Sequence, residues 1–236
     1  LNPFEWTTSP IKCHIDGTIV PGRPIRLLRD GDYKPVPTIS GCVRDEYSFF
    51  ILLDGTRPFP GSWDSYECRV HTLYGDHAEE VLALYPPEDF PNPIAAASAI
   101  EGDRWFKCPM RTTAEALSRH HEETYFFHFT FDDYLLAPFL GATHSLQIFF
   151  VFRTFDQPAM PPFFLVGPGP RGLRLSDQVT RYWTGLARAG DPNSPGLPEW
   201  RRYTLAGKAH LVLDAPIVQG ADLLGEVCDF WDDFGE

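Results

Sequence analysis

Short strand-like runs alternate with helical stretches along this chain, and this alternation constrains the fold more than any other feature. Residues 37–43 form a short apolar run that polar residues end, as in a strand buried inside a parallel sheet. Residues 124–130 have the aromatic and β-branched content of a core strand, and residues 210–214 form another strand. Because helical stretches separate and follow these strands, the order of elements predicts the α/β class. The clearest helical stretches are 95–100, 114–120, 176–189 and 221–234.

Three local predictions concern the segments around these elements. Residues 11–21 indicate two short strands joined by a turn at Asp16-Gly17. Residues 157–170 are so rich in proline that a loop is expected there. Ser176 is placed to cap the N-terminus of the third helix. That helix has an apolar stripe of Val179, Trp183 and Leu186 and is expected to end at 190–193.

The composition narrows the class of function. The 236 residues are 43% hydrophobic, enough for a sizeable core and against disorder. A formal net charge of −12 would repel polyanions, so no nucleic-acid partner is expected. No run of about 18 apolar residues occurs, so the sequence predicts no membrane span. Nothing in the sequence indicates a cofactor.

The chain has five cysteines, and no two of them form a CxxC pair, which argues against a zinc site. No other metal site is predicted. The odd count of cysteines leaves at least one thiol unpaired. Two of them lie in predicted core strands and are expected to be buried thiols, namely Cys13 and Cys42. Cys68 lies in a helical region and has no assigned role, and the remaining two are Cys108 and Cys228.

Four segments occur in an order that is characteristic of one enzyme family. They are GCVRDE at 41–46, GATH at 141–144 followed by IFFVF at 148–152, Trp183 with ARAGDPN at 187–193 and Trp200, and LL at 223–224 with CDFW at 228–231. Together they resemble the type-B carboxylesterases, the family that includes cholinesterases and several lipases. The resemblance covers essentially the whole chain. It implies an α/β-hydrolase fold with a mixed, mostly parallel sheet flanked by helices.

The resemblance also implies that one catalytic residue is not in this sequence. In α/β-hydrolases the nucleophilic serine lies in a G-x-S-x-G motif and precedes the acid and the histidine in the chain. No G-x-S-x-G occurs in these 236 residues, which open at Leu1 without a methionine or signal peptide. Residues 1–236 are therefore expected to form the C-terminal part of one catalytic domain. A partner polypeptide would carry the N-terminal part, with the serine and the Gly-rich oxyanion loop.

Two residues of this chain match the other members of the triad. His144 would be the general base and then the general acid, since imidazole takes and returns a proton near neutral pH. Glu46 would hold the other ring nitrogen and stabilise the imidazolium. The alternatives are a surface-loop histidine and a solvated carboxylate beside Arg44. Asp45 is the rival acid, although its side chain is expected to point elsewhere on the turn.

Three neighbours of these residues depart from the family pattern. Tyr47 and Ser145 stand where glycine usually follows the acid and the histidine, and a larger residue there can change the backbone or narrow the pocket. Gln147 stands where the family commonly has glutamate. The remaining histidines indicate no site. His120 and His121 are adjacent at a helix end and do not share a face, and His128 alternates with aromatics as a packed core histidine would.

The resemblance implies a serine hydrolase that cleaves carboxylic esters, with a small apolar substrate, through an acyl-enzyme. One alternative is a non-catalytic cholinesterase-like domain used for adhesion or scaffolding. Another is an acyltransferase with the same triad. The resemblance further implies a disulfide between Cys108 and Cys228, and hence a secreted or periplasmic protein.

Overall fold

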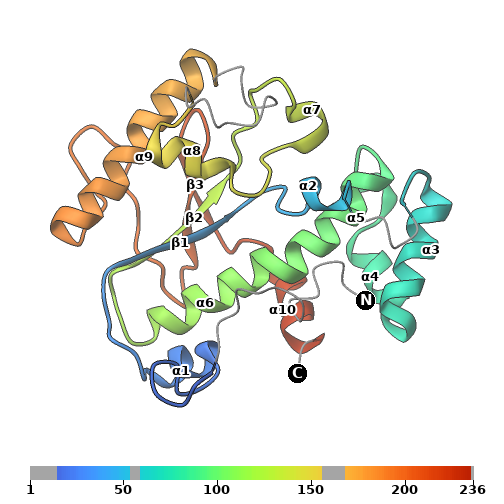
Figure 1. Cartoon of the computed structure of the whole chain (residues 1–236), viewed down its shortest axis with the longest axis horizontal. Coiled ribbons are helices and arrows are strands. Elements are labelled where there is room, and N and C mark those ends of the chain that lie inside the picture. Colours follow the sequence, from blue (N-terminus) through green and yellow to red (C-terminus); the bar gives the residue numbers. More distant parts are fainter. Residues whose placement is uncertain (1–14, 54–58, 156–167, 235–236) are drawn as a thin grey trace.

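A four-stranded sheet is the frame of the chain in a computed structural model, which describes residues 15–53, 59–155 and 168–234. Its strands are β1 (Thr38–Val43), β2 (Thr124–Phe129), β3 (Ala209–Leu213) and β4 (Val218–Ala221), in that spatial order. The β1–β2 and β2–β3 pairs are parallel, and β3 pairs with β4 antiparallel. Helices lie on both faces of this mixed, mostly parallel sheet (Figure 1), so the predicted fold class is confirmed.

Helices precede, separate and follow the strands, and only some of them were predicted from the sequence. Before β2 they are α1 (Pro24–Asp30), α2 (Ser48–Ile51), α3 (Trp63–Tyr74), α4 (Ala78–Leu84), α5 (Pro93–Gly102) and α6 (Cys108–Ser118). After β2 they are α7 (Ala137–Leu140), α8 (Leu146–Phe152), α9 (Gly169–Ala189) and α10 (Gly225–Phe234). Short 3-10 turns occur at Gly75–His77 and Pro87–Asp89, and a π-helical turn over Asp103–Lys107 joins α5 to α6.

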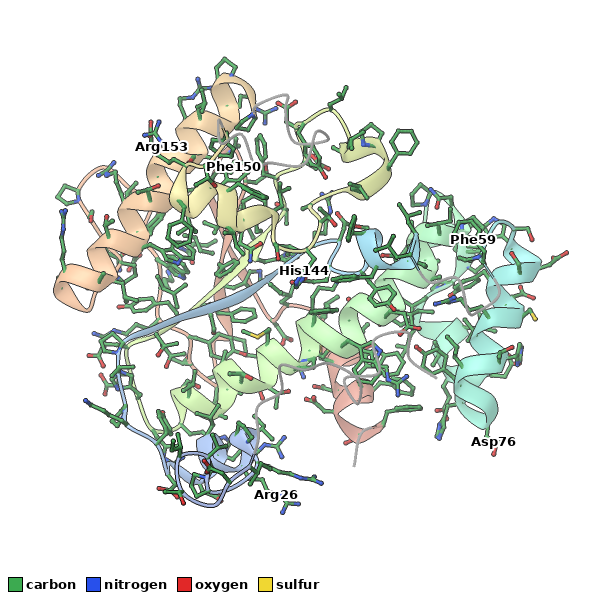
Figure 2. The ribbon with its side chains drawn as sticks, viewed as in Figure 1. Arg26, Phe59, Asp76, His144, Phe150 and Arg153 are labelled. Atoms are coloured by element: carbon green, nitrogen blue, oxygen red, sulfur yellow. A yellow bond between two sulfur atoms is a disulfide. The ribbon has the colours of Figure 1, made fainter. Side chains whose placement is uncertain are left out.

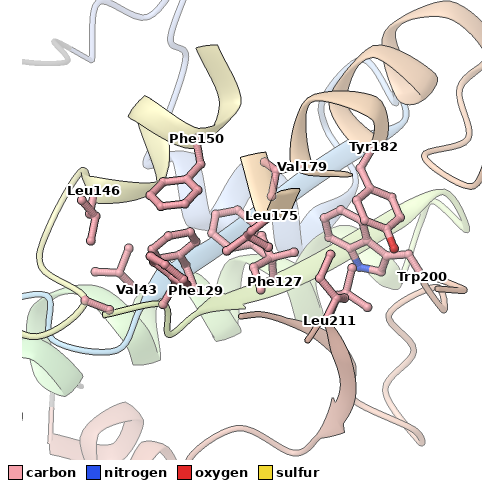
Figure 3. Packing of buried hydrophobic residues seen from close by; sticks show 14 of the residues in the cluster. Val43, Phe127, Phe129, Leu146, Phe150, Leu175, Val179, Tyr182, Trp200 and Leu211 are labelled. Carbon is pink, nitrogen blue, oxygen red and sulfur yellow. The ribbon is translucent and has the colours of Figure 1, made fainter. Parts of the chain in front are cut away.

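One face of the sheet packs against α8 and α9. Phe127 and Phe129 of β2 project from this face into a cluster that includes Phe150 of α8 and Val179 of α9 (Figure 3). Burying a side chain of this size stabilises the fold by about 1.5–3 kcal/mol. The predicted apolar stripe of α9 does face the core. Val179 is buried, and Trp183 and Leu186 pack at the edge of the same cluster. Gly190 ends the helix in the left-handed conformation.

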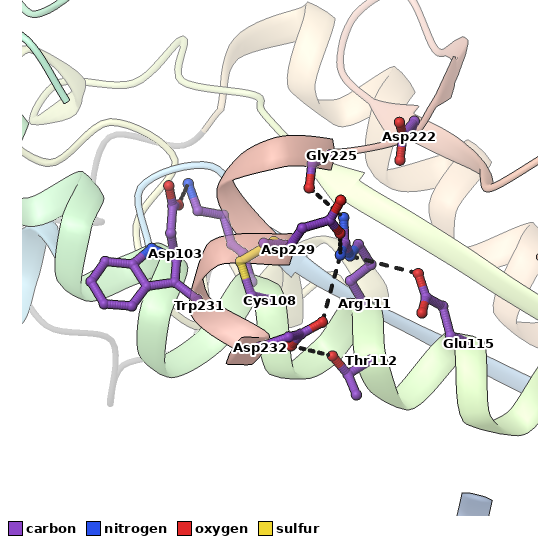
Figure 4. Close-up of a disulfide and its surroundings, with 12 residues drawn as sticks. Asp103, Cys108, Arg111, Thr112, Glu115, Asp222, Gly225, Asp229, Trp231 and Asp232 are labelled. Carbon is purple, nitrogen blue, oxygen red and sulfur yellow. Dashed lines mark hydrogen bonds and ion pairs between the residues drawn. A yellow bond between two sulfur atoms is a disulfide. The ribbon is translucent and has the colours of Figure 1, made fainter. Parts of the chain in front are cut away.

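The opposite face is covered by α6, and α10 is fastened to α6 (Figure 1). The predicted disulfide between Cys108 and Cys228 is confirmed, with a Cα–Cα distance of 5.1 Å. Beside it the buried guanidinium of Arg111 donates to the carbonyl of Gly225 at 3.0 Å and to the Asp229 carboxylate at 2.6 Å (Figure 4). A second apolar cluster joins these elements to α3, α4 and α5, which extend away from the sheet.

Several local predictions were wrong. Ser176 does not cap a helix, because α9 begins at Gly169 and Ser176 lies inside it, with its hydroxyl donating to the Phe150 carbonyl at 2.7 Å. The expected loop extended to residue 170, but Pro170 is in the first turn of α9, where a missing N–H costs no helical hydrogen bond. Strand β4 was not predicted.

The predicted hairpin and the remaining thiols have mixed outcomes. Residues 15–21 form no strand, and the Asp16 carboxylate instead accepts from the backbone N–H groups of 18–20. Residues 11–14, which include Cys13, and residues 156–167 lie outside the described part of the chain. Cys42 is a buried unpaired thiol, as predicted, and Cys68 is an exposed one. Within the described ranges no helix is long and apolar enough to cross a bilayer.

His128 is a half-buried histidine on the α6 side of β2, and it lies within ring contact of His210 in β3. Its pKa is lowered from the ordinary 6.5 to about 3, chiefly because burial disfavours the charged ring, with smaller contributions from Lys107 and His210. The unfolded chain therefore binds this proton more readily than the folded chain between pH 6.5 and 3. The free energy of unfolding is therefore not reduced by His128 above pH 6.5, and it decreases as the pH falls from 6.5 towards 3.

We expect reduction of the disulfide, or the Cys108→Ala/Cys228→Ala variant, to lower the free energy of unfolding by roughly 4–5 kcal/mol. The bond closes a loop of 120 residues, whose entropy in the unfolded state it removes. Denaturant unfolding with and without reductant measures the difference. Peptide mapping that finds Cys108 and Cys228 as free thiols in protein purified without reductant would contradict the assignment.

Below pH 6.5 the free energy of unfolding of the parent protein should fall with pH by up to about 1.4 kcal/mol per unit because of His128. In His128→Leu we expect this contribution to the slope to disappear, since leucine takes up no proton on unfolding. Urea titrations between pH 7 and 4.5 provide the measurement. His71→Leu, at an exposed position, serves as the control for the substitution itself. Equal slopes for the His128 variant and the parent protein would show that His128 is not buried in the neutral form.

Candidate active site

Glu46 and His144 lie beyond the carboxyl ends of two adjacent parallel strands. Glu46 follows β1 by three residues, and His144 lies in the loop between α7 and α8, which follow β2. A single parallel bridge between Asp45 and Thr143 places the two loops side by side. Parallel strands end at the same edge of a sheet, which is where α/β folds collect functional side chains.

The two side chains form a direct hydrogen bond across a sequence separation of 98 residues. Nδ1 of His144 is 2.6 Å from Oε2 of Glu46, and the other carboxylate oxygen accepts from the backbone N–H of Val43 at 2.8 Å. The Glu46 side chain is 7% exposed, whereas that of His144 is 37% exposed. The carboxylate is therefore fixed from behind and the imidazole is accessible at the surface of this chain. Figure 2 shows His144 near the end of β1, where that strand leads towards α2.

Asp45, the rival acid, points away from the imidazole and holds the histidine loop. Its Oδ2 accepts from the backbone N–H of Ala142 at 2.7 Å and from Nε of Arg44 at 2.9 Å. The approach is so close that a Cβ at Gly141, which has φ +58, would lie 2.0 Å from this oxygen. Glycine is needed at 141 for both reasons.

Ser48 connects the two loops, and Tyr134 holds the histidine loop itself. The buried hydroxyl of Ser48 lies 2.6 Å from the Leu140 carbonyl and 2.9 Å from Oγ1 of Thr143. The Tyr134 hydroxyl donates to the Gly141 carbonyl at 2.6 Å. These bonds fix the backbone on the N-terminal side of His144 before any substrate is present.

Two aromatic rings flank the imidazole. The ring of Phe50 in α2 lies 5.2 Å from that of His144, and the ring of Phe106 lies 5.0 Å from it. The two phenyl rings are stacked on each other, with centroids 5.9 Å apart and an interplanar angle of 5°. His144 is thus held against an apolar wall, which favours apolar groups next to the ring.

The departures from the family pattern have different consequences here. Tyr47 has φ −99, an ordinary value, and its side chain is buried in the second apolar cluster, so no glycine is required at this position. Ser145 has φ 66, the left-handed conformation that glycine adopts more readily. In Gln147 the buried Oε1 has no hydrogen-bond partner among the described residues.

His120 and His121 are not brought into a site with other candidate residues among those that the structure describes. His120 contacts the carbonyl of Arg29, and His121 lies near Glu123. Among the residues that the structure describes, no three histidine, cysteine or acidic side chains are grouped as metal ligands. Asp103 and Lys107, a buried ion pair beside the Glu46 turn, were not predicted from the sequence. Opposite charges four residues apart in a helical segment were the available signal.

Known proteins are similar in sequence to this chain over most of its length. A sequence profile described as the carboxylesterase family matches residues 5–231. The acetylcholinesterase of Bungarus fasciatus is 26% identical over 257 aligned residues, which cover 98% of this chain and 41% of the relative. The cocaine esterase of Oryctolagus cuniculus and carboxylesterase 5A of Felis catus are each 28% identical over 92% of this chain. These alignments cover 42% of the first relative and 41% of the second. The chain thus spans about two fifths of the length of these relatives.

We expect Asp45→Ala to lower the free energy of unfolding by about 1.5–3 kcal/mol, because it leaves the Ala142 N–H without its charged acceptor. Asp132→Ala is the matched control. Asp132 also pairs with Arg44, but half of its side chain is exposed, and such surface pairs contribute about 0–1 kcal/mol. Chemical denaturation of the two variants measures the difference, and equal effects would refute a special role for Asp45.

Proposed function

The chain belongs to the carboxylesterase family, and we propose that it supplies the base and the acid of a triad that hydrolyses carboxylic esters. His144 is the proposed base and Glu46 the proposed acid. The observation that carries the proposal is the 2.6 Å hydrogen bond between them, formed on the carboxyl side of a parallel sheet. A histidine oriented by a buried carboxylate is the arrangement that activates a serine nucleophile.

In the proposed reaction, Nε2 of His144 takes the proton of a serine hydroxyl as its oxygen attacks the ester carbonyl. The imidazolium that results is stabilised by Glu46, to which it donates through Nδ1–H. Nε2–H then protonates the departing alkoxide, which leaves as an alcohol, and an acyl-serine remains. Water repeats the sequence on the acyl-serine, with His144 again acting first as base and then as acid, and the carboxylic acid is released.

The serine and the oxyanion hole are proposed to belong to a polypeptide part outside these 236 residues. No G-x-S-x-G is present in the sequence, and family members of which the chain spans about two fifths would have room for such a motif. In α/β-hydrolases the serine precedes the acid and the histidine. Residues 1–236 are accordingly proposed as the C-terminal part of one catalytic domain, with the part that carries the serine as its partner.

The proposed substrate is a small apolar ester. The imidazole lies against the rings of Phe50 and Phe106. The ester group that approaches Nε2 therefore meets an apolar surface. An ester without charge near the reacting carbonyl loses little hydration on such a surface. The bonded geometry of His144 and Glu46 supports this function over a non-catalytic adhesion or scaffold domain, which has no use for it.

A secreted or periplasmic location is proposed from the disulfide. Bonds such as that between Cys108 and Cys228 form and persist in oxidising compartments and are rare in the cytosol. The bond fixes α10 to the start of α6, immediately after the turn that contains Lys107.

We expect His144→Ala, in the complete protein with its nucleophile-bearing part, to lower kcat on a small activated ester by several orders of magnitude. Oxyanion stabilisation and binding alone leave a residual acceleration of about 10³–10⁴ over the reaction in water. Glu46→Gln keeps an oxygen for the Val43 N–H but presents no carboxylate to Nδ1, so we expect a loss of about 100-fold or more.

Steady-state hydrolysis of 4-nitrophenyl acetate provides the measurement, and the exposed His71→Ala is the control that should retain full activity. A His144→Ala variant with more than about a tenth of the parent activity would sink the assignment, because loss of a triad base costs far more.

A further inference from the structure

A buried ion pair lies beside the turn that carries Glu46. Asp103 and Lys107 are four residues apart in the π-helical turn between α5 and α6, and their side chains are 3% and 8% exposed. The ammonium pairs with the Asp103 carboxylate and also donates to the backbone carbonyl of Arg44 at 3.1 Å. Arg44 is the first residue after β1 and stands two positions before Glu46.

Burying such a pair is costly, and apolar side chains of similar volume are often as stable or more stable. Burial is the largest single influence on Lys107 and would lower its pKa, but the contributions of Asp103, Cys42 and Asp45 together outweigh it, so the pKa is raised and the ammonium stays charged. A charged lysine with a carboxylate on one side and a carbonyl on the other fixes both groups relative to each other. Lys107 therefore fixes the position of the Arg44 carbonyl, which an apolar side chain of similar volume would not do.

The other end of the pair is firmly anchored. Oδ2 of Asp103 accepts from the Tyr85 hydroxyl at 2.9 Å, and the same hydroxyl oxygen accepts from the indole N–H of Trp231 at 2.8 Å. Trp231 belongs to α10, which the disulfide at Cys108 fastens to α6 (Figure 4). A continuous chain of hydrogen bonds and one ion pair therefore runs from α10 through Asp103 and Lys107 to the Arg44 carbonyl.

The carbonyl of Arg44 is the point at which this chain meets the candidate triad. The N–H of Arg44 bonds to the Phe129 carbonyl at 2.9 Å and so continues the β1–β2 ladder, whereas its own carbonyl is bonded by Lys107. The chain then turns, and the Glu46 carboxylate folds back onto the Val43 N–H to face His144. A rotation of the Arg44–Asp45 peptide would move that carboxylate.

We propose that Lys107 is a positioning residue for Glu46: by holding the Arg44 carbonyl it fixes the turn that presents the carboxylate to His144. The inference rests on the proposed function, in which Glu46 is the acid. Lys107 contacts neither the imidazole nor a reacting atom. Its removal is therefore expected to reduce kcat and to leave substrate binding unchanged.

The test compares two neutral variants of the complete protein, Asp103→Asn/Lys107→Met and Asp103→Asn/Lys107→Gln. Both remove the two charges, so no carboxylate is left stranded, and the introduced side-chain amide still offers an oxygen to the Tyr85 hydroxyl. Only the Gln variant keeps an N–H donor for the Arg44 carbonyl. We expect the Met variant to lose about 10- to 100-fold in kcat on 4-nitrophenyl acetate, with KM within about threefold, and the Gln variant to recover part of that loss.

The control is Arg111→Met/Asp229→Asn. This pair also joins a buried cation to a carboxylate and to a backbone carbonyl, that of Gly225, but it fastens α10 instead of the Glu46 turn. It should lower the free energy of unfolding without changing kcat.

A second readout does not depend on esterase activity. In protein labelled with ¹⁵N-histidine, the Nδ1–H proton of His144 reports its hydrogen bond to Glu46 by NMR. We expect this resonance to shift or broaden in the Met variant and to be unchanged in the Arg111 control. If His144→Ala retains activity, the proposed function fails, and the resonance still decides whether Lys107 positions Glu46. A Met variant with parent kcat and an unchanged resonance, or Met and Gln variants with equal kcat, would overturn the proposal.

Discussion

The parallel pairing of β1 with β2 is the constraint on which the candidate site depends. The six residue pairs of its register run from Thr38 with Thr124 to Val43 with Phe129, so both strands end at the same level. The chain leaves β1 directly into the Glu46 turn, and the bridge from Asp45 to Thr143 extends the pairing beyond the sheet. Two side chains that are 98 residues apart in sequence consequently meet at a hydrogen-bonding distance.

The sheet also explains why adjacent acidic residues have different roles. Asp45 reaches forward along the extended pairing and holds the histidine loop through Ala142, whereas Glu46 folds back to the end of β1. The polar groups of this edge form two separate branches, one from Arg44 through Asp45 to the Ala142 N–H and one from Glu46 to the imidazole. Such networks are rigid only when their buried members are all bonded, and two buried supports here are Ser48 and Lys107.

The sequence predicted the strands β1, β2 and β3, the fold class and the disulfide, because each depends on a local pattern or on motifs in a characteristic order. It did not predict β4, a strand of four residues that is mostly exposed and has no apolar alternation. The beginning of α9 was misplaced because Pro170 resembles a loop residue and is also accepted in a first helical turn. For the candidate site, the sequence named His144 and Glu46 but not what supports them. The roles of Asp45, Ser48 and Lys107 depend on which backbone groups the fold brings within reach, and local patterns do not contain that information.

His144 and Glu46 of this chain are proposed to serve a serine that lies outside it. The most direct test is to trap the acyl-enzyme. The complete protein is mixed with an activated ester, quenched in acid within a turnover and digested, and the acyl group is located by mass spectrometry. The account predicts one acyl group, on a serine outside residues 1–236, and none at the same time point in the His144→Ala variant. An acyl group on a residue of this chain, or an undiminished yield without His144, would contradict it.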